Sequence, residues 1–192
     1  SRWLPGICSG ELITAIAMTE PGIGSDLASM STTALRDGDD YVVNGSKTWT
    51  TMAQYADRMF CLCRTNTEAK FQEGISFLLI DMKQPGVEVK PIRTMDGGHE
   101  VNTVYLTDVK VPVENLVGEE NKGWTYAKFL LGHERSGTSN VARSKAQIGR
   151  LRAIAAAEIE GGEPLIERKQ FRDKLAEVEI ELRSLEYTEL RY

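Results

Sequence analysis

Hydrophobic and polar positions alternate in short runs over the first 116 residues, and turn-forming residues separate the runs. Such alternation is typical of β-strands that bury one face. The runs cover residues 31–35, 41–43, 46–49, 59–63, 75–80, 87–91, 101–106 and 109–111. Because no segment with a helical period lies between them, the pattern predicts an antiparallel β-barrel or sandwich.

Two turn signals predict hairpins near the start of this region. Asp37-Gly38 lies between the first two runs, and Asn44-Gly45 separates residues 41–43 from 46–49. Both dipeptides tolerate the positive φ that tight hairpin turns require. We therefore expect a meander of linked hairpins, with later turns at Pro85-Gly86, Gly97-Gly98 and Thr107-Asp108.

After residue 116 the hydrophobic period becomes that of α-helices. Helices are predicted over residues 123–132 and 141–157, and a break at residues 161–164 precedes a third. The third helix repeats apolar residues at spacings of three and four: Phe171, Leu175, Val178, Leu182 and Leu185. We predict an α+β chain with a middle β domain over residues 1–116 and the first helices of a helical bundle over residues 117–192. Further helices are needed to cover the apolar stripe.

Composition and charge exclude several classes of protein. The 192 residues are 41% hydrophobic and 27% charged, which fits a folded protein with a proper core. A net charge of −5 disfavours nucleic-acid binding, because that function relies on clustered Lys and Arg. No run approaches the roughly 18 apolar residues of a membrane span. Because the chain starts at Ser1 without an initiator Met or a signal peptide, we expect it to be cut from a longer protein.

The cysteines and histidines predict no metal site. Cys8, Cys61 and Cys63 are expected to be unpaired thiols in a reducing compartment, and we expect the last two to point to opposite faces of one strand. His99 and His133 lie far apart and lack the spacing of metal ligands. No G-x-S-x-G elbow accompanies them, so a catalytic triad is not expected either.

Four features could carry chemistry. Met18–Asp26 contains two glycines two residues apart, and its backbone could approach phosphate oxygens or form a purely structural turn. Trp49-Thr50-Thr51 could offer a planar face and hydroxyls, although core packing is the better interpretation of the Trp alone. Arg135 could meet a phosphate or pair with a neighbouring carboxylate. Glu20 could be a general base, but beside a Pro-Gly turn a structural role is favoured.

Taken together, these segments resemble the acyl-CoA dehydrogenase family from about Ile7 to at least Ala157. The resemblance rests on several motifs in one order and at family spacing: Met18–Asp26, Val43–Thr51, Pro85–Val87, Val109–Gly118 and Glu134-Arg135. Members have an N-terminal helical domain, a middle β domain and a C-terminal four-helix domain, with FAD between the last two. The resemblance implies that this chain holds the middle domain and the start of the C-terminal domain.

The resemblance also implies an activity. Family members dehydrogenate an acyl-CoA thioester to a trans-2-enoyl-CoA, with FAD as cofactor and electron-transfer flavoprotein as the expected acceptor. The parent protein is expected to be a homodimer or homotetramer, in the cytoplasm of a bacterium or in the mitochondrial matrix. Neither a nucleic acid nor a membrane is expected as a partner.

Residue roles follow by analogy at the matching positions. The Met18 backbone and the Thr19 hydroxyl would meet the flavin ring, and Gly24 and Ser25 would approach its pyrophosphate. Trp49 would pack on the flavin and Thr51 would bond near N5, with Thr50 between them. The substrate contacts would be Ser25, near the CoA, and Arg135.

The sequence departs from the family pattern in two places. Gly132 replaces an acidic residue often found three positions before Arg135, and Phe171 is not followed by the Gly of a C-terminal signature. The family's catalytic Glu is expected beyond Tyr192, so no residue of this chain is assigned as the base and the isolated chain is expected to be inactive. The alternatives are an acyl-CoA oxidase or a related flavin enzyme, or a non-catalytic scaffold. A looser resemblance points to enzymes for dicarboxylyl substrates such as pimeloyl-CoA.

Overall fold

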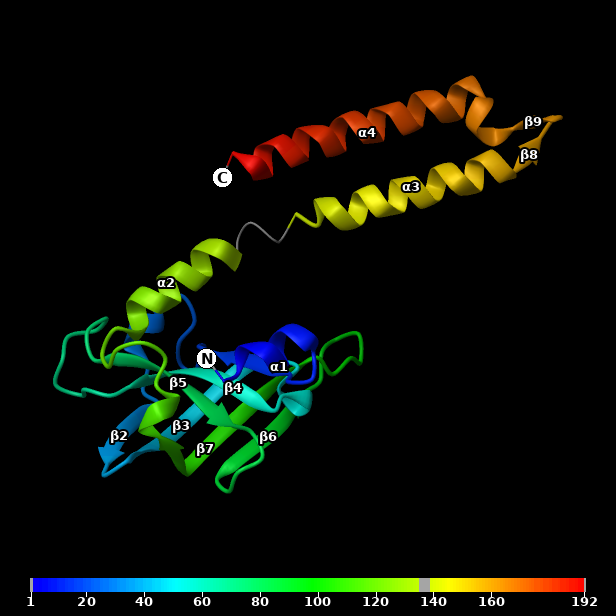
Figure 1. Cartoon of the computed structure of the whole chain (residues 1–192). Helices are drawn as coiled ribbons and strands as arrows, with labels where there is room; N and C mark the ends of the chain where they lie inside the picture. Colours follow the sequence, from blue (N-terminus) through cyan, green and yellow to red (C-terminus); the bar gives the residue numbers. More distant parts are fainter. Residues whose placement is uncertain (1, 135–138, 192) are drawn as a thin grey trace. The chain divides into compact units, whose positions relative to one another are not determined.

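The computed structural model, which describes residues 2–134 and 139–191, divides into a β unit, Ser1–Lys128, and a helical unit, Phe129–Tyr192 (Figure 1). The predicted α+β class is therefore confirmed. The division falls within helix α2 (Gly123–Glu134), later in the chain than the domain boundary predicted after residue 116. That boundary remains a prediction.

One curled sheet of seven strands forms the β unit (Figure 1). The short helix α1 (Leu4–Ser9) precedes it, and single helical turns η1 (Leu27–Ser29), η2 (Ala53–Tyr55) and η3 (Val113–Asn115) interrupt its connections. The strands are β1 (Thr14–Ala17), β2 (Thr33–Asp37), β3 (Asp40–Thr51), β4 (Arg58–Arg64), β5 (Ile75–Asp81), β6 (Val87–Ile92) and β7 (Val101–Pro112). Their order is β1-β4-β2-β3-β7-β6, with β5 also paired to β4.

The sheet is mixed. The pairs β2–β3, β3–β7, β4–β5 and β6–β7 are antiparallel, as predicted, whereas β1 runs parallel to β4 and β2 meets β4 in parallel at one residue pair. Strand β1 was missed because its partner lies about forty residues later, so no local turn signal marks it. The parallel pairing places β1 beside β4, and the segment that follows β1 reaches β3, where the Thr48 N–H donates to the Thr19 carbonyl.

The first predicted hairpin is confirmed and the second is wrong. Asp37 pairs with Asp40, which leaves Gly38 and Asp39 as a two-residue turn, and Gly38 has φ of 60°. Asn44-Gly45 forms no turn, because β3 continues through both residues. Gly45 is needed for a close approach of the chain before β2: a Cβ atom at this position would lie 2.7 Å from the Cα of Thr32.

Strand β7 likewise continues through the turn predicted at Thr107-Asp108. The register with β3 shifts there, so the two residues form a bulge opposite Asn44. The Asn44 amide donates to the Asp108 carboxylate at 3.1 Å, and the Asp108 N–H donates to the Asn44 side chain at 2.9 Å. Because side chains alternate along a strand, this extra residue lets both Leu106 and Val109 face the core.

Small and β-branched residues make up most of the core inside the curled sheet. Its members include Ala15, Ala17, Ala34, Tyr41, Val43, Met59, Cys61, Cys63, Leu78, Ile80, Val104, Leu106, Val109 and Val111. The expectation that Cys61 and Cys63 point to opposite faces was wrong, because residues two apart on a strand share a face. Both thiols face the core with their sulfur atoms 3.6 Å apart. All three cysteines are free, and Cys8 is exposed.

The helical unit is an antiparallel helix pair, α3 (Val141–Ala157) and α4 (Lys169–Leu190) (Figure 1). The Gly-Gly break predicted between them is a small hairpin of β8 (Ile159–Glu160) and β9 (Glu163–Pro164), followed by the turn η5 (Leu165–Glu167). Ion pairs Arg152–Glu179 and Lys145–Glu186 join the two helices.

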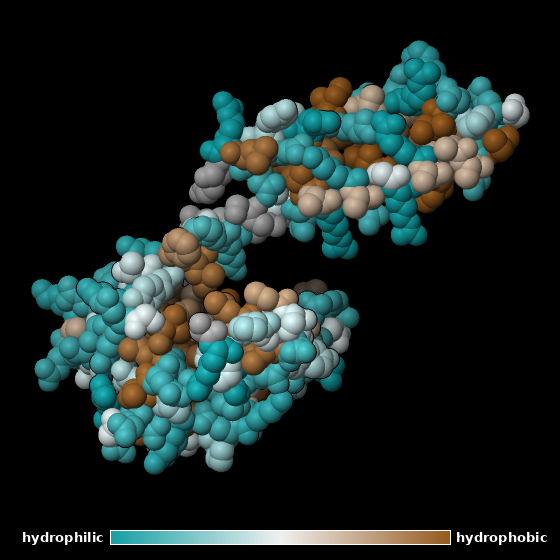
Figure 2. Space-filling view, in the orientation of Figure 1, coloured by the Kyte–Doolittle hydropathy of each residue, from teal (hydrophilic) through white to brown (hydrophobic). Residues whose placement is uncertain are grey.

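Part of the apolar stripe predicted on the last helix packs against α3, and part stays exposed. Leu175 is buried, whereas Val178 and Leu185 are about half exposed. Figure 2 shows apolar side chains among polar ones on the visible face of this helix pair. No helix within the described ranges, 2–134 and 139–191, has both the length and the apolar character to cross a membrane.

Candidate functional site

The turn at Met18–Asp26 and the Trp49-Thr50-Thr51 segment lie side by side. Two hydrogen bonds dock the turn onto β3: the Thr48 N–H donates to the Thr19 carbonyl at 2.9 Å, and the Lys47 ammonium donates to the Met18 carbonyl at 3.1 Å. The structure thus brings together the two segments that the sequence singled out. Their roles in binding a cofactor remain predictions.

A buried ion pair underlies the docked turn. The Lys47 ammonium lies 2.9 Å from a Glu20 carboxylate oxygen, and the two side chains are 0% and 4% exposed. The other donors to the carboxylate come from the segment before β2: the Ser31 N–H and hydroxyl at 2.7 Å each, and the Thr32 N–H at 2.9 Å. With both oxygens engaged, Glu20 has the structural role that the sequence favoured, not that of a general base.

These contacts shift the pKa of Glu20. Burial by itself would raise the pKa, but the charge of Lys47 and the hydrogen bonds from Thr32 and Ser31 outweigh it and lower the pKa of Glu20 to about 2. The carboxylate is therefore charged at any pH at which the protein is expected to work. Its folded-state pKa lies well below its ordinary value of 4.5.

Stability is expected to fall in acid. Because the folded pKa of Glu20 is depressed, its contribution is complete above about pH 4.5 and is lost as the pH falls toward about 2. The shift corresponds to about 3 kcal/mol in the free energy of unfolding. Urea unfolding at pH 7 and at pH 3 measures about 2 kcal/mol of this loss, because pH 3 still lies above the folded-state pKa.

The control for this pH dependence is Glu20→Gln, whose stability should change much less over the same range. Two other carboxyl groups titrate alike in both proteins: hydrogen bonds from Lys83 and from Thr94 lower the pKa of Asp57 and of Asp96, respectively. The difference between the two curves therefore isolates Glu20. Parallel curves for the two proteins would contradict the assignment.

Lys47 also sets the direction of a peptide group. In a planar trans peptide the N–H points opposite to the C=O. Because the Met18 carbonyl accepts from Lys47, the Thr19 N–H of the same peptide points away from the ion pair. The hydrogen bond from the buried Lys47 ammonium thus fixes the direction of one backbone donor of the site, the Thr19 N–H.

The glycines of the turn leave open space. A Cβ atom added to Gly22 or Gly24 would meet no atom within 4 Å, and neither residue has a left-handed φ. Strain or crowding inside the chain therefore does not require these glycines. Ser25, next to Gly24, is exposed. Such a bare backbone is suited to close approach by a ligand.

Arg64 anchors the segment that directly follows the turn. Its guanidinium donates to the carbonyls of Ala28 at 2.6 Å and Met30 at 3.2 Å, and to the carbonyls of Phe71 and Glu73 on another loop. A planar group with five fixed donors can hold several carbonyls in this way. The turn is thus fixed at one end by Lys47, and the segment that follows it is fixed by Arg64.

Trp49 lies on a bulge and points outward. The register between β3 and β7 shifts between Lys47 and Thr50, and Trp49 has φ of 58°. Its side chain is 59% exposed, so the core packing favoured from the Trp alone is wrong. The physical reason is the extra residue: in a regular strand position 49 would share the buried face of Lys47.

The bulge also determines which of the neighbouring side chains point to the surface and which point to the interior. Thr50 is 1% exposed and its hydroxyl has no hydrogen-bond partner, whereas Thr51 is exposed. Beneath Thr50 lies the amide of Asn102, which donates to the Thr50 carbonyl at 3.2 Å. Of the three consecutive residues, Trp49 and Thr51 thus present side chains to the surface, and Thr50 presents only backbone.

The remaining candidates are Arg135 and the two histidines. Arg135 lies outside the described residues. His99 bonds to Asn102, and His133 contacts the Phe129 carbonyl, so each belongs to a local network. Within residues 2–134 and 139–191, the side chains of His, Cys, Asp and Glu form no group of three or more that could hold a metal ion.

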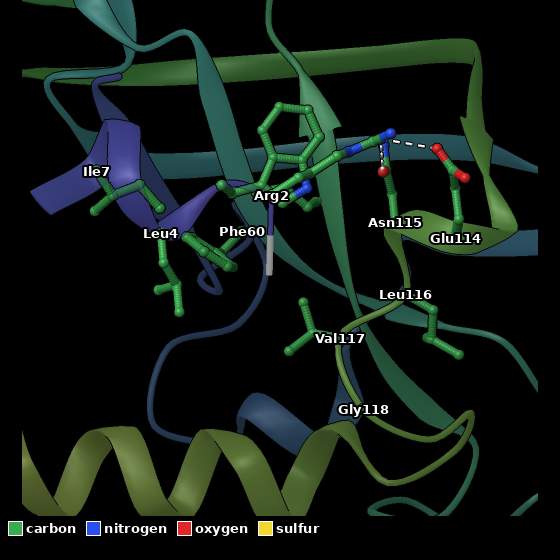
Figure 3. Close-up of a pocket in the computed structure, with 11 residues that line it drawn as sticks. Arg2, Leu4, Ile7, Phe60, Glu114, Asn115, Leu116, Val117 and Gly118 are labelled. Atoms are coloured by element: carbon green, nitrogen blue, oxygen red, sulfur yellow. Dashed lines mark hydrogen bonds and ion pairs between the residues drawn. The ribbon is translucent and has the colours of Figure 1, made fainter. Parts of the chain in front are cut away.

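A cavity of about 620 Å³ lies elsewhere in the β unit, between α1, the β4–β5 pair and residues 114–118 (Figure 3). Leu4, Ile7, Phe60 and Val117 give it an apolar lining, and Arg2 bonds to Glu114 at 2.8 Å on its rim. It contains none of the candidate site residues.

Three residues that shape the site were missed from the sequence: Lys47, Arg64 and Asn102. The signal for Lys47 was available, since it occupies an inward-facing position of an alternating strand, where a charge needs a buried partner. Nothing local marks their contacts with the site, because Arg64 reaches Ala28 and Asn102 reaches Thr50 across long stretches of chain.

The arrangement suits a planar aromatic cofactor that carries phosphates. An exposed indole, the Thr51 hydroxyl and a directed N–H lie beside a glycine turn with open space and an exposed Ser25. A planar ring can pack on the indole face, and phosphates can approach bare backbone. Glu20 is not available as a base, because both of its oxygens accept hydrogen bonds.

Comparisons with known proteins identify a family that the chain resembles over much of its length. Residues 15–109 match the family model described as acyl-CoA dehydrogenase, middle domain. Acyl-CoA dehydrogenase FadE29 of Mycobacterium tuberculosis is 42% identical over 177 residues, which cover 92% of this chain and 46% of the relative. The caffeyl-CoA reductase-Etf complex subunit CarC of Acetobacterium woodii is 37% identical, covering 92% of this chain and 45% of the relative.

Solved structures show the same fold. An acyl-CoA dehydrogenase from Geobacillus kaustophilus superposes with a TM-score of 0.74 at 36% identity, covering 95% of this chain and 49% of that one. The chain therefore spans about half the length of the relatives that it matches.

Proposed function

The chain belongs to the acyl-CoA dehydrogenase family, and on that premise we propose that it supplies the β-domain wall of an FAD site in an enzyme that dehydrogenates acyl-CoA thioesters. The product is a trans-2-enoyl-CoA. The observation that carries the proposal is the docking of Met18–Asp26 beside the outward-facing Trp49, because this places an aromatic face next to a bare glycine turn.

The residues of the turn and the bulge divide the binding between them. Trp49 packs on the flavin ring, the Thr51 hydroxyl bonds near N5, and Thr50 contributes backbone only. The Met18–Thr19 backbone and the Thr19 hydroxyl line the edge of the ring, and Gly24 and Ser25 approach the pyrophosphate. When bound, FAD supplies the acceptor for the hydride that leaves the β carbon of the acyl chain. Fixed donors around such a ring favour its electron-rich form.

The substrate and the other components complete the proposal. Ser25 and Arg135 contact the CoA thioester. Glu20 is not the base that removes the α proton, since Lys47, Ser31 and Thr32 occupy its oxygens. A glutamate outside this site fills that role.

Electron-transfer flavoprotein accepts the electrons, and the Etf complex named for the Acetobacterium relative supports this partner. The whole protein is a homodimer or homotetramer. Its location is the cytoplasm of a bacterium or the mitochondrial matrix.

Trp49 provides the test of the cofactor site. FAD added to the 192-residue chain is expected to bind saturably and to quench the fluorescence of Trp49, because a flavin stacked on the indole accepts its excitation. In Trp49→Ala, binding should weaken about tenfold or more, the loss expected for an aromatic stacking contact of roughly 1.4 kcal/mol or more. Equilibrium dialysis with FAD measures the affinity independently of fluorescence.

Trp124→Phe, on α2, is the matched control and should bind FAD as the unaltered chain does. Absence of saturable FAD binding by the unaltered chain would overturn the proposal, and so would unchanged affinity in Trp49→Ala.

A further inference from the structure

Asparagines close two separate bulges in the pairing of β3 with β7. Asn44 bonds to the Asp108 bulge near one end of the pair, and Asn102 lies beneath the Trp49 bulge near the other end. Both bulges place a non-glycine residue at positive φ, 49° at Asp108 and 58° at Trp49. Only the second belongs to the proposed FAD site, so one strand pair holds a test position and its matched control.

Asn102 is fully buried and every polar atom of its side chain is used. The amide nitrogen donates to the Thr50 carbonyl at 3.2 Å and to the Gln54 side-chain oxygen at 2.6 Å. Because both partners are acceptors, this atom must be the NH₂ group. The side-chain oxygen then accepts a hydrogen bond from His99 Nε2 at 2.8 Å.

The contacts close into a ring. The Gln54 amide donates to the backbone carbonyl of His99 at 3.1 Å, which joins η2 to the loop before β7. The ring therefore runs from Asn102 to Gln54, on to His99 and back to Asn102. Asn102 is the buried member of this ring, whereas Gln54 and His99 are half-buried. Displacement of the Asn102 amide would leave a buried polar group unpaired, so the ring resists it.

The ring acts on the peptide between Thr50 and Thr51. Trp49 has a backbone conformation that costs a non-glycine residue about 1–2 kcal/mol, so neighbouring contacts must hold it. Asn102 provides such a contact one residue later, at the Thr50 carbonyl. If that carbonyl were released, a regular register would turn position 49 toward the buried face.

We propose that Asn102 is a positioning residue of the FAD site, which holds Trp49 and Thr51 outward by fixing the Thr50 carbonyl through a closed ring with Gln54 and His99. Asn102 touches no cofactor atom itself. The expected effect on FAD affinity rests on the proposed function. The expected effect on the exposure of Trp49 does not.

The experiment compares Asn102→Ala with Asn44→Ala. Both variants are made in a chain with Trp3→Phe and Trp124→Phe, so that Trp49 is the only tryptophan left in the sequence. Both are expected to lose stability in urea. Only Asn102→Ala should shift the Trp49 emission to shorter wavelength, reduce its quenching by acrylamide and weaken FAD binding about tenfold, a loss equivalent to roughly 1.4 kcal/mol.

A third variant, Gln54→Ala, keeps the bond from Asn102 to Thr50 and breaks the ring. It should give changes of the same direction and smaller size. If Asn102→Ala does not fold, Gln54→Ala still tests the proposal.

The outcomes separate the two proposals. If the Trp49 emission and the FAD affinity of Asn102→Ala match those of Asn44→Ala, the positioning role is wrong. If the unaltered chain binds no FAD but Trp49 emission still changes only in Asn102→Ala, the role of Asn102 stands and the proposed function fails. If Asn102→Ala does not fold and Gln54→Ala leaves both readouts unchanged, the positioning role is also wrong.

Discussion

Replacement of Lys47 by methionine is expected to lower the free energy of unfolding by about 3–5 kcal/mol, the usual cost of removing one partner from a buried ion pair. Methionine keeps the unbranched stem of lysine, so packing changes little. The loss arises because Glu20, 4% exposed, keeps its charge in the core without its counter-ion. The Met18 carbonyl also loses a donor, which frees the turn that carries the candidate site.

Urea unfolding followed by circular dichroism at pH 7 measures this effect. Lys90→Met is the control, because its pair with Glu88 is more than half exposed and should change stability by about 0.5 kcal/mol or less. In the double variant Lys47→Met/Glu20→Met, a large part of the loss should be recovered, since no unpaired charge remains. A cost for Lys47→Met no greater than that of Lys90→Met would contradict the buried pair.

Gly45→Ala is expected to destabilise the β unit by on the order of 3 kcal/mol, in the range of severe steric and backbone substitutions. Gly45 has φ of 149°, and an added Cβ would lie 2.5 Å from Thr32 Oγ1 and 2.7 Å from Thr32 Cα. The backbone of Thr32 must then move. Its N–H is one of the donors to Glu20, so the displacement reaches the ion pair.

Gly38→Ala is the control that separates the steric contact with Thr32 from the cost of a positive φ. Gly38 also has a positive φ, 60°, but an added Cβ would meet nothing within 4 Å. It should cost only about 1–2 kcal/mol, from the backbone conformation alone. The same urea experiment compares the two variants, and equal losses would show that the contact with Thr32 is unimportant.

Local features of the sequence predicted much of the fold. The turn at Gly38 and the helix pair α3 and α4 were predicted because turn chemistry and helical period act over a few residues. The same signal misled at Asn44-Gly45: this dipeptide suits a hairpin turn, but here its glycine relieves a contact with Thr32 and its asparagine closes a bulge. The contacts with Thr32 and Asp108 that override the turn signal are distant in the chain. A short stretch of sequence around Asn44-Gly45 therefore could not reveal them.

The candidate site divides in the same way. Met18–Asp26 and Trp49-Thr50-Thr51 were recognised as motifs, and the structure places them together. The direction of Trp49 could not be derived from strand alternation, because one extra residue in β3 reverses the facing of the positions that follow. Nor could the ring around Asn102, which depends on a partner 52 residues away.

That separation along the chain gives the site a place in the order of folding. Contacts between distant residues form after local ones, because a long loop must first be closed. Thr50 leaves the ribosome well before Asn102, so the Trp49 bulge lacks its support until β7 has been synthesised and paired with β3. The surface proposed to hold FAD therefore forms late in the folding of the β unit. A cofactor that needs this surface binds only chains in which β7 has already paired with β3.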